Sequence, residues 1–323
     1  MKKVRFGIIG TGGIAEKFAV SAAYVPEAEM VGAASRSLEK AQQFAQKFVI
    51  PKAYGSYEAL LRDDEIDAVY IATPHSHHKE NCLAAIAHGK HILCEKPLVL
   101  TKANAEQVFA AAAEKGLFIM EAMWTRFIPT FVKAKEWVNA GRIGDIRLIQ
   151  ASLGFHAPED PNSRLLSKDL AGGALYDLGV YLFELTQEFT RGKRLAEVQS
   201  FSIPAATGVD GSDSIVFRHE DGTIAQLFCS LLCDVENTAI LYGEKGYIKL
   251  LPDFHHPRRA ELYQNYRLVE TFEPEYHLGY EFEIRHAARC IAEGRLISDI
   301  IPPGDTIECE AMFEDLLFRW GYT

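Results

Sequence analysis

The sequence predicts an α/β protein in which a doubly wound parallel sheet comes first and an α/β region with a mostly antiparallel sheet follows. In roughly the first third of the chain, short apolar runs alternate with helical patterns, which indicates βαβ units and parallel pairing. The runs are continuously apolar, as expected for strands that are buried on both faces. From Glu197 to Val269, strand patterns are instead separated by hairpin-type turns, which favours antiparallel pairing.

The elements of the first region follow from these runs and from the periodicity between them. The expected strands are Val4–Ile9, Met30–Ala34, Ala68–Ala72, His91–Cys94 and Leu117–Met120. The expected helices are Ile14–Ala23, Leu38–Phe48, His77–His88 and Ala103–Lys115. A parallel sheet with helices on both faces accommodates this order, and we assign residues 1–122 to it.

The second region, residues 123–323, has a different pattern. Its expected helices are Phe131–Ala140, Gly173–Phe189, Glu275–Glu293 and Asp305–Trp320. A strand at Ile146–Gly154 leads into a polar loop at 157–170, and hairpin-type turns are expected at Glu220–Thr223 and Tyr242–Gly246. We expect the last helix either to stay with this region or to pack back on the first.

The composition excludes several classes of function. The net charge of the 323-residue chain is −10 and no run of Lys and Arg is present, which argues against a nucleic-acid partner. No apolar stretch is long enough to span a bilayer, and glycines interrupt the apolar segment near the N-terminus, so neither a membrane span nor a signal peptide is expected. The six cysteines are scattered, which argues against structural zinc and a disulfide framework. We therefore expect a cytoplasmic protein.

A glycine-rich turn follows the first expected strand. Gly10-Thr11-Gly12-Gly13-Ile14-Ala15 fits the pattern G-x-G-x-x-A between a buried strand and a helix. Gly10 permits a tight turn, Gly12 lets the backbone approach a pyrophosphate, and Ala15 keeps the helix close to the strand. The helix N-terminus then offers free N–H groups to phosphates. This context predicts a dinucleotide site.

The end of the second expected strand distinguishes NAD from NADP. An NAD site usually has Asp or Glu here for the ribose 2′-hydroxyl. This chain has Ser35-Arg36-Ser37 instead, without a carboxylate. Arg36 can pair with a 2′-phosphate, stack on the adenine, or do both, and the serine hydroxyls can add donors. The alternative is that Arg36 and Ser37 merely begin the next helix; we favour NADP(H) as the cofactor.

Four further motifs carry a resemblance to a known family. They are Thr73-Pro74-His75-Ser76-His77-His78, Cys94-Glu95-Lys96-Pro97-Leu98, Glu121–Pro129 and Gly172–Tyr181. Their order resembles the glucose-fructose oxidoreductase / inositol dehydrogenase (Gfo/Idh/MocA) family over nearly the whole chain. The segment Met120–Phe127 and Tyr181 are similar to the dimeric dihydrodiol dehydrogenase branch, which also includes NADP-linked D-xylose dehydrogenases.

The resemblance implies a Rossmann domain followed by an α/β domain whose large open sheet often forms a dimer interface in this family. It implies that Lys96 is catalytic and that Pro97 follows a cis peptide bond, which is uncommon and would aim the lysine into a cleft. Much of the family has histidine four residues after the aspartate, whereas this chain has Tyr181 after Asp177. That departure favours the dihydrodiol dehydrogenase branch. We expect a homodimer or a higher homo-oligomer through the second sheet.

The chemistry depends on Asp177 and Tyr181, which are four residues apart on an expected helix and so share one face. Oxidation of an alcohol requires a base for the hydroxyl proton while hydride leaves the same carbon. A phenol has an unperturbed pKa of about 10, and a nearby ammonium lowers it. The hypothesis is that Tyr181 exchanges the proton, Lys96 tunes it and binds the substrate oxygen, and Asp177 orients substrate or lysine. The roles of Lys96 and Tyr181 could also be exchanged.

The remaining candidates come from the same motifs and from one strand end. The expected cofactor-binding residues are Gly10, Thr11, Gly12, Gly13, Ile14, Ser35, Arg36, Thr73, Pro74, His75, His78, Glu95, Lys96, Pro97, Trp124 and Arg126. The expected substrate-binding residues are Lys96, Trp124, Phe155, His156, Asp177 and Tyr181. For Trp124 and Arg126, the alternative is packing at the junction of the two regions.

The histidine run at His75, His77 and His78 is weak evidence for convergent ligands, so we expect no metal site. His255 and His256 lie in an expected turn and are predicted at the surface.

These expectations combine into reversible hydride transfer between NADP(H) and a hydroxyl-bearing carbon of a sugar or cyclic (dihydro)diol. The expected partners are this small-molecule substrate and further copies of the chain. One alternative is an NADP-sensing regulatory protein without turnover, against which Lys96 and Tyr181 argue. Another is a sugar–sugar oxidoreductase that keeps its cofactor tightly bound.

Overall fold

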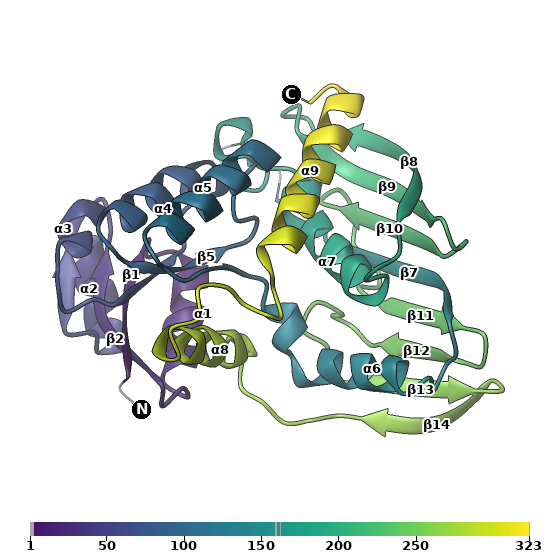
Figure 1. The fold of residues 1–323 in the computed structure, drawn as a ribbon. Helices are drawn as coiled ribbons and strands as arrows, with labels where there is room; N and C mark the ends of the chain where they lie inside the picture. The colour runs from purple at the N-terminus through teal and green to yellow at the C-terminus, as the bar shows by residue number, and fades with distance from the viewer. Residues whose placement is uncertain (1–2, 159, 162, 323) are drawn as a thin grey trace. The chain divides into compact units, whose positions relative to one another are not determined.

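The computed structural model describes residues 3–158, 160–161 and 163–322 (Figure 1). The chain forms two compact units: unit 1 comprises Met1–Trp124 and His277–Ala311, and unit 2 comprises Thr125–Tyr276 and Met312–Thr323. The expected division lay between residues 122 and 123. In the structure, unit 1 also includes the C-terminal segment His277–Ala311. The polar loop expected at 157–170 includes residues 159 and 162, which lie outside the described residues.

Unit 1 contains a parallel six-stranded sheet in the order β3-β2-β1-β4-β5-β6. Its strands are β1 (Val4–Ile9), β2 (Ala28–Ala34), β3 (Lys52–Tyr54), β4 (Ala68–Ile71), β5 (His91–Glu95) and β6 (Ile119–Ala122). The strand order reverses between β1 and β4, and ligands of doubly wound sheets bind outside the carboxyl ends of the strands at such a point. The parallel sheet predicted from the apolar runs is confirmed.

Helices cover the sheet of unit 1. They are α1 (Gly13–Ala22), α2 (Leu38–Phe48), α3 (Tyr57–Leu61), α4 (His78–Ala87), α5 (Lys102–Glu114) and α8 (Tyr280–Ala292), with a 3-10 turn, η1, at His75–His77. Ser37, Ser56 and Thr101 begin α2, α3 and α5, because each side chain accepts a backbone N–H of the first turn. The helix α8, which follows the second sheet in sequence, packs against α1.

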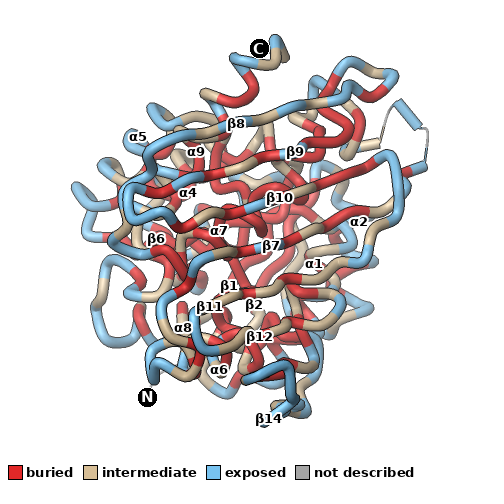
Figure 2. Tube along the Cα trace, turned by 90° about the vertical axis from the view of Figure 1, so that its right-hand side faces the viewer, coloured by how far each residue is buried: buried red, intermediate tan, exposed pale blue. Residues whose placement is uncertain are grey.

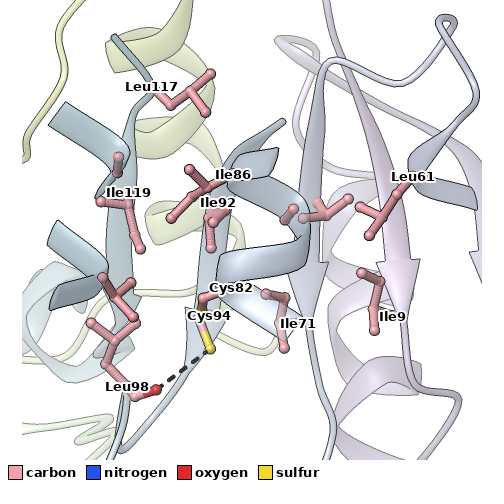
Figure 3. Close-up of a cluster of buried hydrophobic side chains, with 14 of the residues drawn as sticks. Ile9, Leu61, Ile71, Cys82, Ile86, Ile92, Cys94, Leu98, Leu117 and Ile119 are labelled. Carbon is pink, nitrogen blue, oxygen red and sulfur yellow. Dashed lines mark hydrogen bonds between the residues drawn. The ribbon is translucent and has the colours of Figure 1, made fainter. Parts of the chain in front are cut away.

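One hydrophobic core of unit 1 lies between the sheet and helices α4 and α5 (Figure 3). Ile71 and Ile92 from neighbouring strands and Ile86 from α4 point into it and are at most 4% exposed. Burial of an aliphatic side chain of this size stabilises the fold by about 1.5–3 kcal/mol. The thiol of Cys94 lies in the same core, 3.9 Å from the Leu98 carbonyl oxygen, so the loop after β5 starts from a rigid strand.

Unit 2 contains an eight-stranded sheet in the order β14-β13-β12-β11-β7-β10-β9-β8. Its strands are β7 (Ile146–Gly154), β8 (Leu195–Pro204), β9 (Asp210–His219), β10 (Ile224–Ser230), β11 (Ala239–Gly243), β12 (Tyr247–Leu250), β13 (Ala260–Gln264) and β14 (Arg267–Phe272). All neighbours are antiparallel except β7 and β10, which are parallel. The large, mostly antiparallel sheet and its two predicted hairpin turns are confirmed.

Two helices lie on one face of this sheet, α6 (Pro129–Asn139) and α7 (Val180–Phe189), together with the last turns of α9 (Pro303–Trp320) (Figure 1). The helix α7 is preceded by a π-helical turn, η4 (Leu175–Gly179), and by a 3-10 turn, η3 (Lys168–Leu170). Figure 2 looks onto the other face of the sheet, and no helix crosses in front of its strands.

Three local expectations differ from the structure. The edge strand β3 and helix α3 were not predicted, because Lys52–Tyr54 is a three-residue strand without an apolar run. The helix expected to begin at Glu275 begins at Tyr280. The helix expected over Gly173–Phe189 is interrupted by the π turn η4, which is a feature that often occurs at functional sites. No helix among the described residues is long and apolar enough to cross a bilayer.

Candidate active site

The carboxyl ends of β1, β2 and β4 lie side by side at the strand-order reversal of unit 1. The Gly10 N–H donates to the Ala34 carbonyl oxygen (3.0 Å), and the Ala72 N–H donates to the Ile9 carbonyl oxygen (2.8 Å). Gly10 has φ +96°, and an added Cβ would lie 2.8 Å from the Ala72 oxygen. A side chain at position 10 is therefore excluded by both conformation and space.

The start of α1 fits a pyrophosphate group. Gly12 is the N-cap residue, and no side chain hydrogen-bonds there, so the first N–H groups of the helix have no side-chain acceptor. Cβ atoms added at Gly12 or Gly13 would meet no atom within 4 Å, which leaves open space over this backbone. Thr11 and Ile14 flank the turn and are half-buried. Helix N-termini of this kind bind phosphate oxygens through their N–H groups and the helix dipole.

The end of β2 carries the residues expected to distinguish the two dinucleotides. Arg36 is exposed, and among the described residues it forms no salt bridge. Ser35 is buried, whereas the Ser37 hydroxyl accepts the Lys40 N–H (3.4 Å) as the N-cap of α2. Ser37 therefore caps the start of the helix, as the alternative interpretation held. Tyr57 lies close enough for the charge of Arg36 to lower its pKa, although burial raises that pKa overall.

The loop after β4 is tied to the loop after β5 by His78. This imidazole is fully buried, with Nδ1 2.8 Å from the Pro97 carbonyl oxygen and Nε2 2.8 Å from the Thr73 carbonyl oxygen. Burial lowers the pKa of His78, and the nearby Lys96 charge lowers it further. The neighbouring His75 ring is buried at 5.7 Å from the His78 ring. His78 thus connects the loop after β4 to the loop after β5 through hydrogen bonds.

The loop that carries Lys96 is held from several sides. The peptide bond between Lys96 and Pro97 is cis, which confirms the expectation from the family resemblance. The Leu98 N–H donates to the Glu121 carboxylate (3.0 Å), which also accepts the Thr306 hydroxyl (2.8 Å). The next N–H, of Val99, donates to Glu310 (3.4 Å). The C-terminal segment of unit 1 therefore fixes the backbone beside Lys96.

Two buried carboxyl groups lie behind this loop. Glu95 accepts a hydrogen bond from the Tyr70 hydroxyl, and both side chains are buried. Glu283, on α8, is fully buried, and neither of its carboxyl oxygens has a hydrogen-bond partner among the described residues. Burial raises the pKa of Glu283 well above its usual range, and the charge of Glu95 raises it further. Burial therefore favours the neutral form of Glu283, and Glu95 is the acceptor for the Tyr70 hydroxyl.

Trp124 and Arg126 occupy buried positions within their units. The Trp124 ring stacks on the Tyr280 ring at 4.0 Å in unit 1. The Arg126 guanidinium is 3% exposed and pairs with Glu184 (Nε to Oε2, 2.8 Å) and Glu188 (Nη1 to Oε2, 3.6 Å) in unit 2. These contacts favour the packing alternative for Arg126, since its charge is compensated by buried carboxylates of its own unit.

Asp177 and Tyr181 lie at the start of the long helical segment of unit 2. Asp177 belongs to the π turn η4 and Tyr181 to the first turn of α7, and both are buried. The Asp177 carboxylate accepts a hydrogen bond from Arg164 (Nη1 to Oδ1, 2.7 Å), whose side chain is 55% exposed. Sequence analysis did not identify this partner, because Arg164 lies in the preceding polar loop.

The Tyr181 ring lies next to His255, a residue whose burial was predicted wrongly. The His255 ring lies 5.1 Å away and is half-buried rather than at the surface. The Thr125 hydroxyl donates to the His255 carbonyl oxygen (2.6 Å) and fixes the turn. The substrate candidates Phe155 and His156 continue beyond β7; Phe155 is half-buried, and His156 is exposed with its N–H bound to Asp234 (3.0 Å). The described residues contain no cluster of three metal-ligating side chains.

Comparisons with known proteins agree with this architecture. The model of an oxidoreductase family with an NAD-binding Rossmann fold, GFO_IDH_MocA, matches residues 4–123, and the model of the GFO/IDH/MocA C-terminal domain matches residues 131–249. Trans-1,2-dihydrobenzene-1,2-diol dehydrogenase of Mus musculus is 34% identical over 330 residues, covering 99% of this chain and 98% of the relative. The corresponding Xenopus tropicalis protein is 32% identical over 327 residues, with the same coverage.

Solved structures show the same fold. A tyrosine-to-phenylalanine mutant of KijD10, a 3-ketoreductase from Actinomadura kijaniata in complex with TDP-benzene and NADP, superposes with a TM-score of 0.88 at 26% identity, covering 98% of both chains. An aldose-aldose oxidoreductase from Caulobacter crescentus has a TM-score of 0.88 at 22% identity, covering 99% of this chain and 97% of that one. Together with the glycine turn and the Glu-Lys-Pro loop, these findings identify the chain as a member of the GFO/IDH/MocA family of NAD(P)-binding oxidoreductases.

Proposed function

We propose that this protein is an NADP(H)-dependent dehydrogenase that transfers hydride between the nicotinamide and a hydroxyl-bearing carbon of a sugar or cyclic (dihydro)diol. The observation that carries the cofactor assignment is Arg36: an exposed guanidinium, with no acidic partner in the described part of the chain, follows β2, where NAD sites usually hold a carboxylate. The mouse relative is a dihydrobenzenediol dehydrogenase, and the Actinomadura kijaniata neighbour is a 3-ketoreductase solved with NADP. Both support the proposed substrate class.

The proposed cofactor site uses the open backbone at Gly12 and Gly13 for the pyrophosphate and Arg36 for the 2′-phosphate. Thr73, His75 and the Glu95–Pro97 segment are assigned to the nicotinamide half. When bound, the nicotinamide ring supplies the acceptor or donor of hydride.

The proposed proton chemistry uses three side chains. Tyr181 takes the proton of the substrate hydroxyl, Lys96 hydrogen-bonds the same oxygen and favours the phenolate through its charge, and Asp177 orients the substrate. The opposite assignment, in which Lys96 exchanges the proton, uses the same groups. The solved variants of the 3-ketoreductase include one in which a lysine is replaced and one in which a tyrosine is replaced, which supports this choice of residue types.

The cofactor assignment is tested by Arg36→Ala. The wild-type protein is expected to have a higher kcat/KM with NADP than with NAD, and the substitution should lower that ratio by about 10- to 100-fold, because a charge-assisted hydrogen bond contributes about 1.5–3 kcal/mol. The measurement is the NADP-coupled absorbance assay on a panel of pentoses, hexoses, inositols and trans-dihydrodiols. Arg62→Ala, which removes an exposed arginine at the C-terminal end of α3 paired with Glu58, is the matched control. A clear preference of the wild-type protein for NAD would overturn the assignment.

We also propose that copies of the chain associate through the open face of the eight-stranded sheet. Phe201 and Ile203 are exposed by 78% and 61% on β8, while the alternate residues Ser200 and Ser202 hydrogen-bond the C-terminal segment on the other face. Exposed apolar side chains on an uncovered sheet indicate an interaction surface. This face is visible in Figure 2.

The expected result is a solution mass of at least twice the 36.1 kDa of one chain, measured by light scattering after gel filtration. Replacing Phe201 and Ile203 together by Asp should give the monomer mass, because burying two carboxylates in an interface is unfavourable. Phe318→Asp, at an exposed position on α9, should leave the mass unchanged. A monomeric wild-type protein would exclude this interface.

A further inference from the structure

The N-terminal end of the helical segment that carries Asp177 and Tyr181 is held by a buried carboxylate from β9. The Asp210 Oδ2 atom accepts the Leu175 N–H at 2.6 Å, and the backbone of Ala174 also hydrogen-bonds this carboxyl group. Asp210 is 1% exposed. A carboxylate in this position satisfies N–H groups that the first turn of a helix leaves without partners, and it lies at the positive end of the helix dipole.

The chain before the helix is packed against the same carboxylate. Gly173 has φ +127°, and an added Cβ would lie 2.0 Å from Asp210 Oδ1, so only glycine fits. The Gly172 and Gly173 N–H groups donate to the carbonyl oxygens of Ser167 and Leu165 at 2.9 Å each. The loop containing Arg164, the partner of Asp177, is therefore joined to the helix start at the point that Asp210 holds.

A second buried carboxyl group, Asp213, pairs with Asp210. Three residues apart on a regular strand, the two side chains would point to opposite faces. The pairing of β9 with β8 shifts by one residue here, since Ile203 pairs with Ser212 but Pro204 pairs with Asp210. The extra residue, Gly211, restores both aspartates to one face, as a β-bulge does.

In the described part of the chain, the hydrogen-bond donors that surround the pair are neutral groups. The Ser202 hydroxyl donates to Asp213 Oδ1 (2.6 Å) and is 3.1 Å from the Tyr322 hydroxyl, and the Cys229 thiol is 3.5 Å from Asp213 Oδ2. From η4, the groups that face the pair are backbone N–H groups. Among the described residues, no Lys, Arg or His forms an ion pair with either aspartate.

Two adjacent buried carboxyl groups without a cation hold one proton between them. Burial and, to a smaller extent, the charge of Asp210 together raise the pKa of Asp213 to about 9, so Asp213 keeps the proton at neutral pH. The Asp213 hydroxyl then donates to Asp210. Burial raises the pKa of Asp210 too, while the hydrogen bonds from Asp213 and from the backbone of Leu175 and Ala174 lower it, so Asp210 is the acceptor that faces the helix N–H groups.

We propose that the Asp210–Asp213 pair is a positioning device that fixes the helix start bearing Asp177 and Tyr181 for catalysis. This inference rests on the proposed function, because it assigns those two residues to the reaction. Asp210 holds the first turn in position through its hydrogen bonds to the backbone. Asp213 hydrogen-bonds Asp210 and so fixes the orientation of the Asp210 side chain. Neither residue is required to touch substrate or cofactor.

The test compares Asp210→Ala, Asp210→Asn and Asp213→Asn with the wild-type protein on its best substrate from the panel above. Asp210→Ala should lower kcat by on the order of 100-fold, because small misplacement of reacting groups costs that much. The KM for NADP should change by less than about twofold, since the cofactor site belongs to unit 1. Asp210→Asn should restore part of kcat, because its amide oxygen can still accept the Leu175 N–H. Asp213→Asn should keep kcat near the wild-type value at neutral pH, because it imitates the protonated acid.

A merely structural role would lower the yield of folded protein and leave the kcat of that fraction unchanged. The active fraction is therefore measured by titration of NADP binding through protein fluorescence. If folded Asp210→Ala keeps kcat within about twofold of wild type, the inference is overturned; if this variant does not fold, Asp210→Asn decides by the same criterion. Tyr181→Phe is assayed in parallel. If Tyr181→Phe loses turnover while the Asp210 variants keep it, only the positioning inference fails. If Tyr181→Phe keeps full turnover, the proposed function itself fails.

Discussion

Lys96→Met and Tyr181→Phe are each expected to lower kcat by on the order of 10²–10⁴-fold, which is the usual contribution of a positioned acid–base group. Methionine keeps the length of the lysine side chain and removes its charge, and phenylalanine removes a single hydroxyl. The loop at Lys96 is held by the hydrogen bonds of its neighbours Pro97 and Leu98 to His78 and Glu121, so the backbone should keep its place in the variant. The measurement is the NADP-coupled absorbance assay with the best substrate of the panel.

Two control substitutions separate chemistry from packing. Lys102→Met removes an exposed lysine in unit 1 whose ammonium lies 3.8 Å from Glu106, and Tyr176→Phe removes a hydroxyl five residues before Tyr181. Both should keep turnover within about threefold of wild type, since surface and peripheral substitutions usually change stability by less than about 0.5 kcal/mol. Near-normal turnover of Lys96→Met together with Tyr181→Phe would exclude the mechanism. NADP binding without turnover in the wild-type protein would instead support a regulatory role.

The regular parts of the fold could be predicted because their signals are local. A continuous apolar run such as Ala68–Ile71 specifies a strand buried on both faces, and Gly222 specifies the hairpin between β9 and β10. The strand β3 could not be predicted, because the burial of Lys52–Tyr54 depends on its neighbour β2 and is only partial. The π turn before α7 has no local signal either, since its residues would suit an α-helix equally well.

In the candidate site, too, some residues could be predicted from the sequence and others could not. Residues that follow strands, such as Gly10, Arg36 and Lys96, could be identified because motif and strand end coincide in the sequence. The partners of Arg126 could not, since Glu184 lies 58 residues away and only the folded chain brings them together.

The Asp210–Asp213 pair shows why alternation alone is insufficient. A spacing of three residues on a strand predicts opposite faces, and only the bulge at Gly211 overrides that rule. The contact of Tyr181 with His255 is a further case, because it joins a helix to a turn that looks like surface in the sequence.

Asp213→Asn is expected to stabilise the protein against unfolding at neutral and alkaline pH, by an amount that grows as the pH rises. Burial and, to a smaller extent, the charge of Asp210 raise the pKa of Asp213 from 3.8 to about 9. Between these two values the folded protein holds one proton that the unfolded chain has released. The free energy of unfolding of the wild-type protein therefore falls with pH, by about 1.4 kcal/mol per pH unit for one proton. This stabilising contribution is complete below about pH 4 and is lost as the pH rises through about 9.

Asparagine removes this dependence because its amide is neutral at every pH and has nearly the same shape as the protonated acid. Urea unfolding at several pH values from 6 to 9 measures the difference between variant and wild type, which should widen steadily over the range. Asp221→Asn is the control of opposite sign: a hydrogen bond from Lys193 lowers the pKa of that exposed carboxyl group, so its loss should destabilise the protein at neutral pH. Parallel stability curves for Asp213→Asn and wild type from pH 6 to 9 would show that Asp213 is already ionised at neutral pH. In that case the carboxylates of Asp210 and Asp213 would both be charged next to the start of η4. Asp210 would then not be the only anion near this first turn.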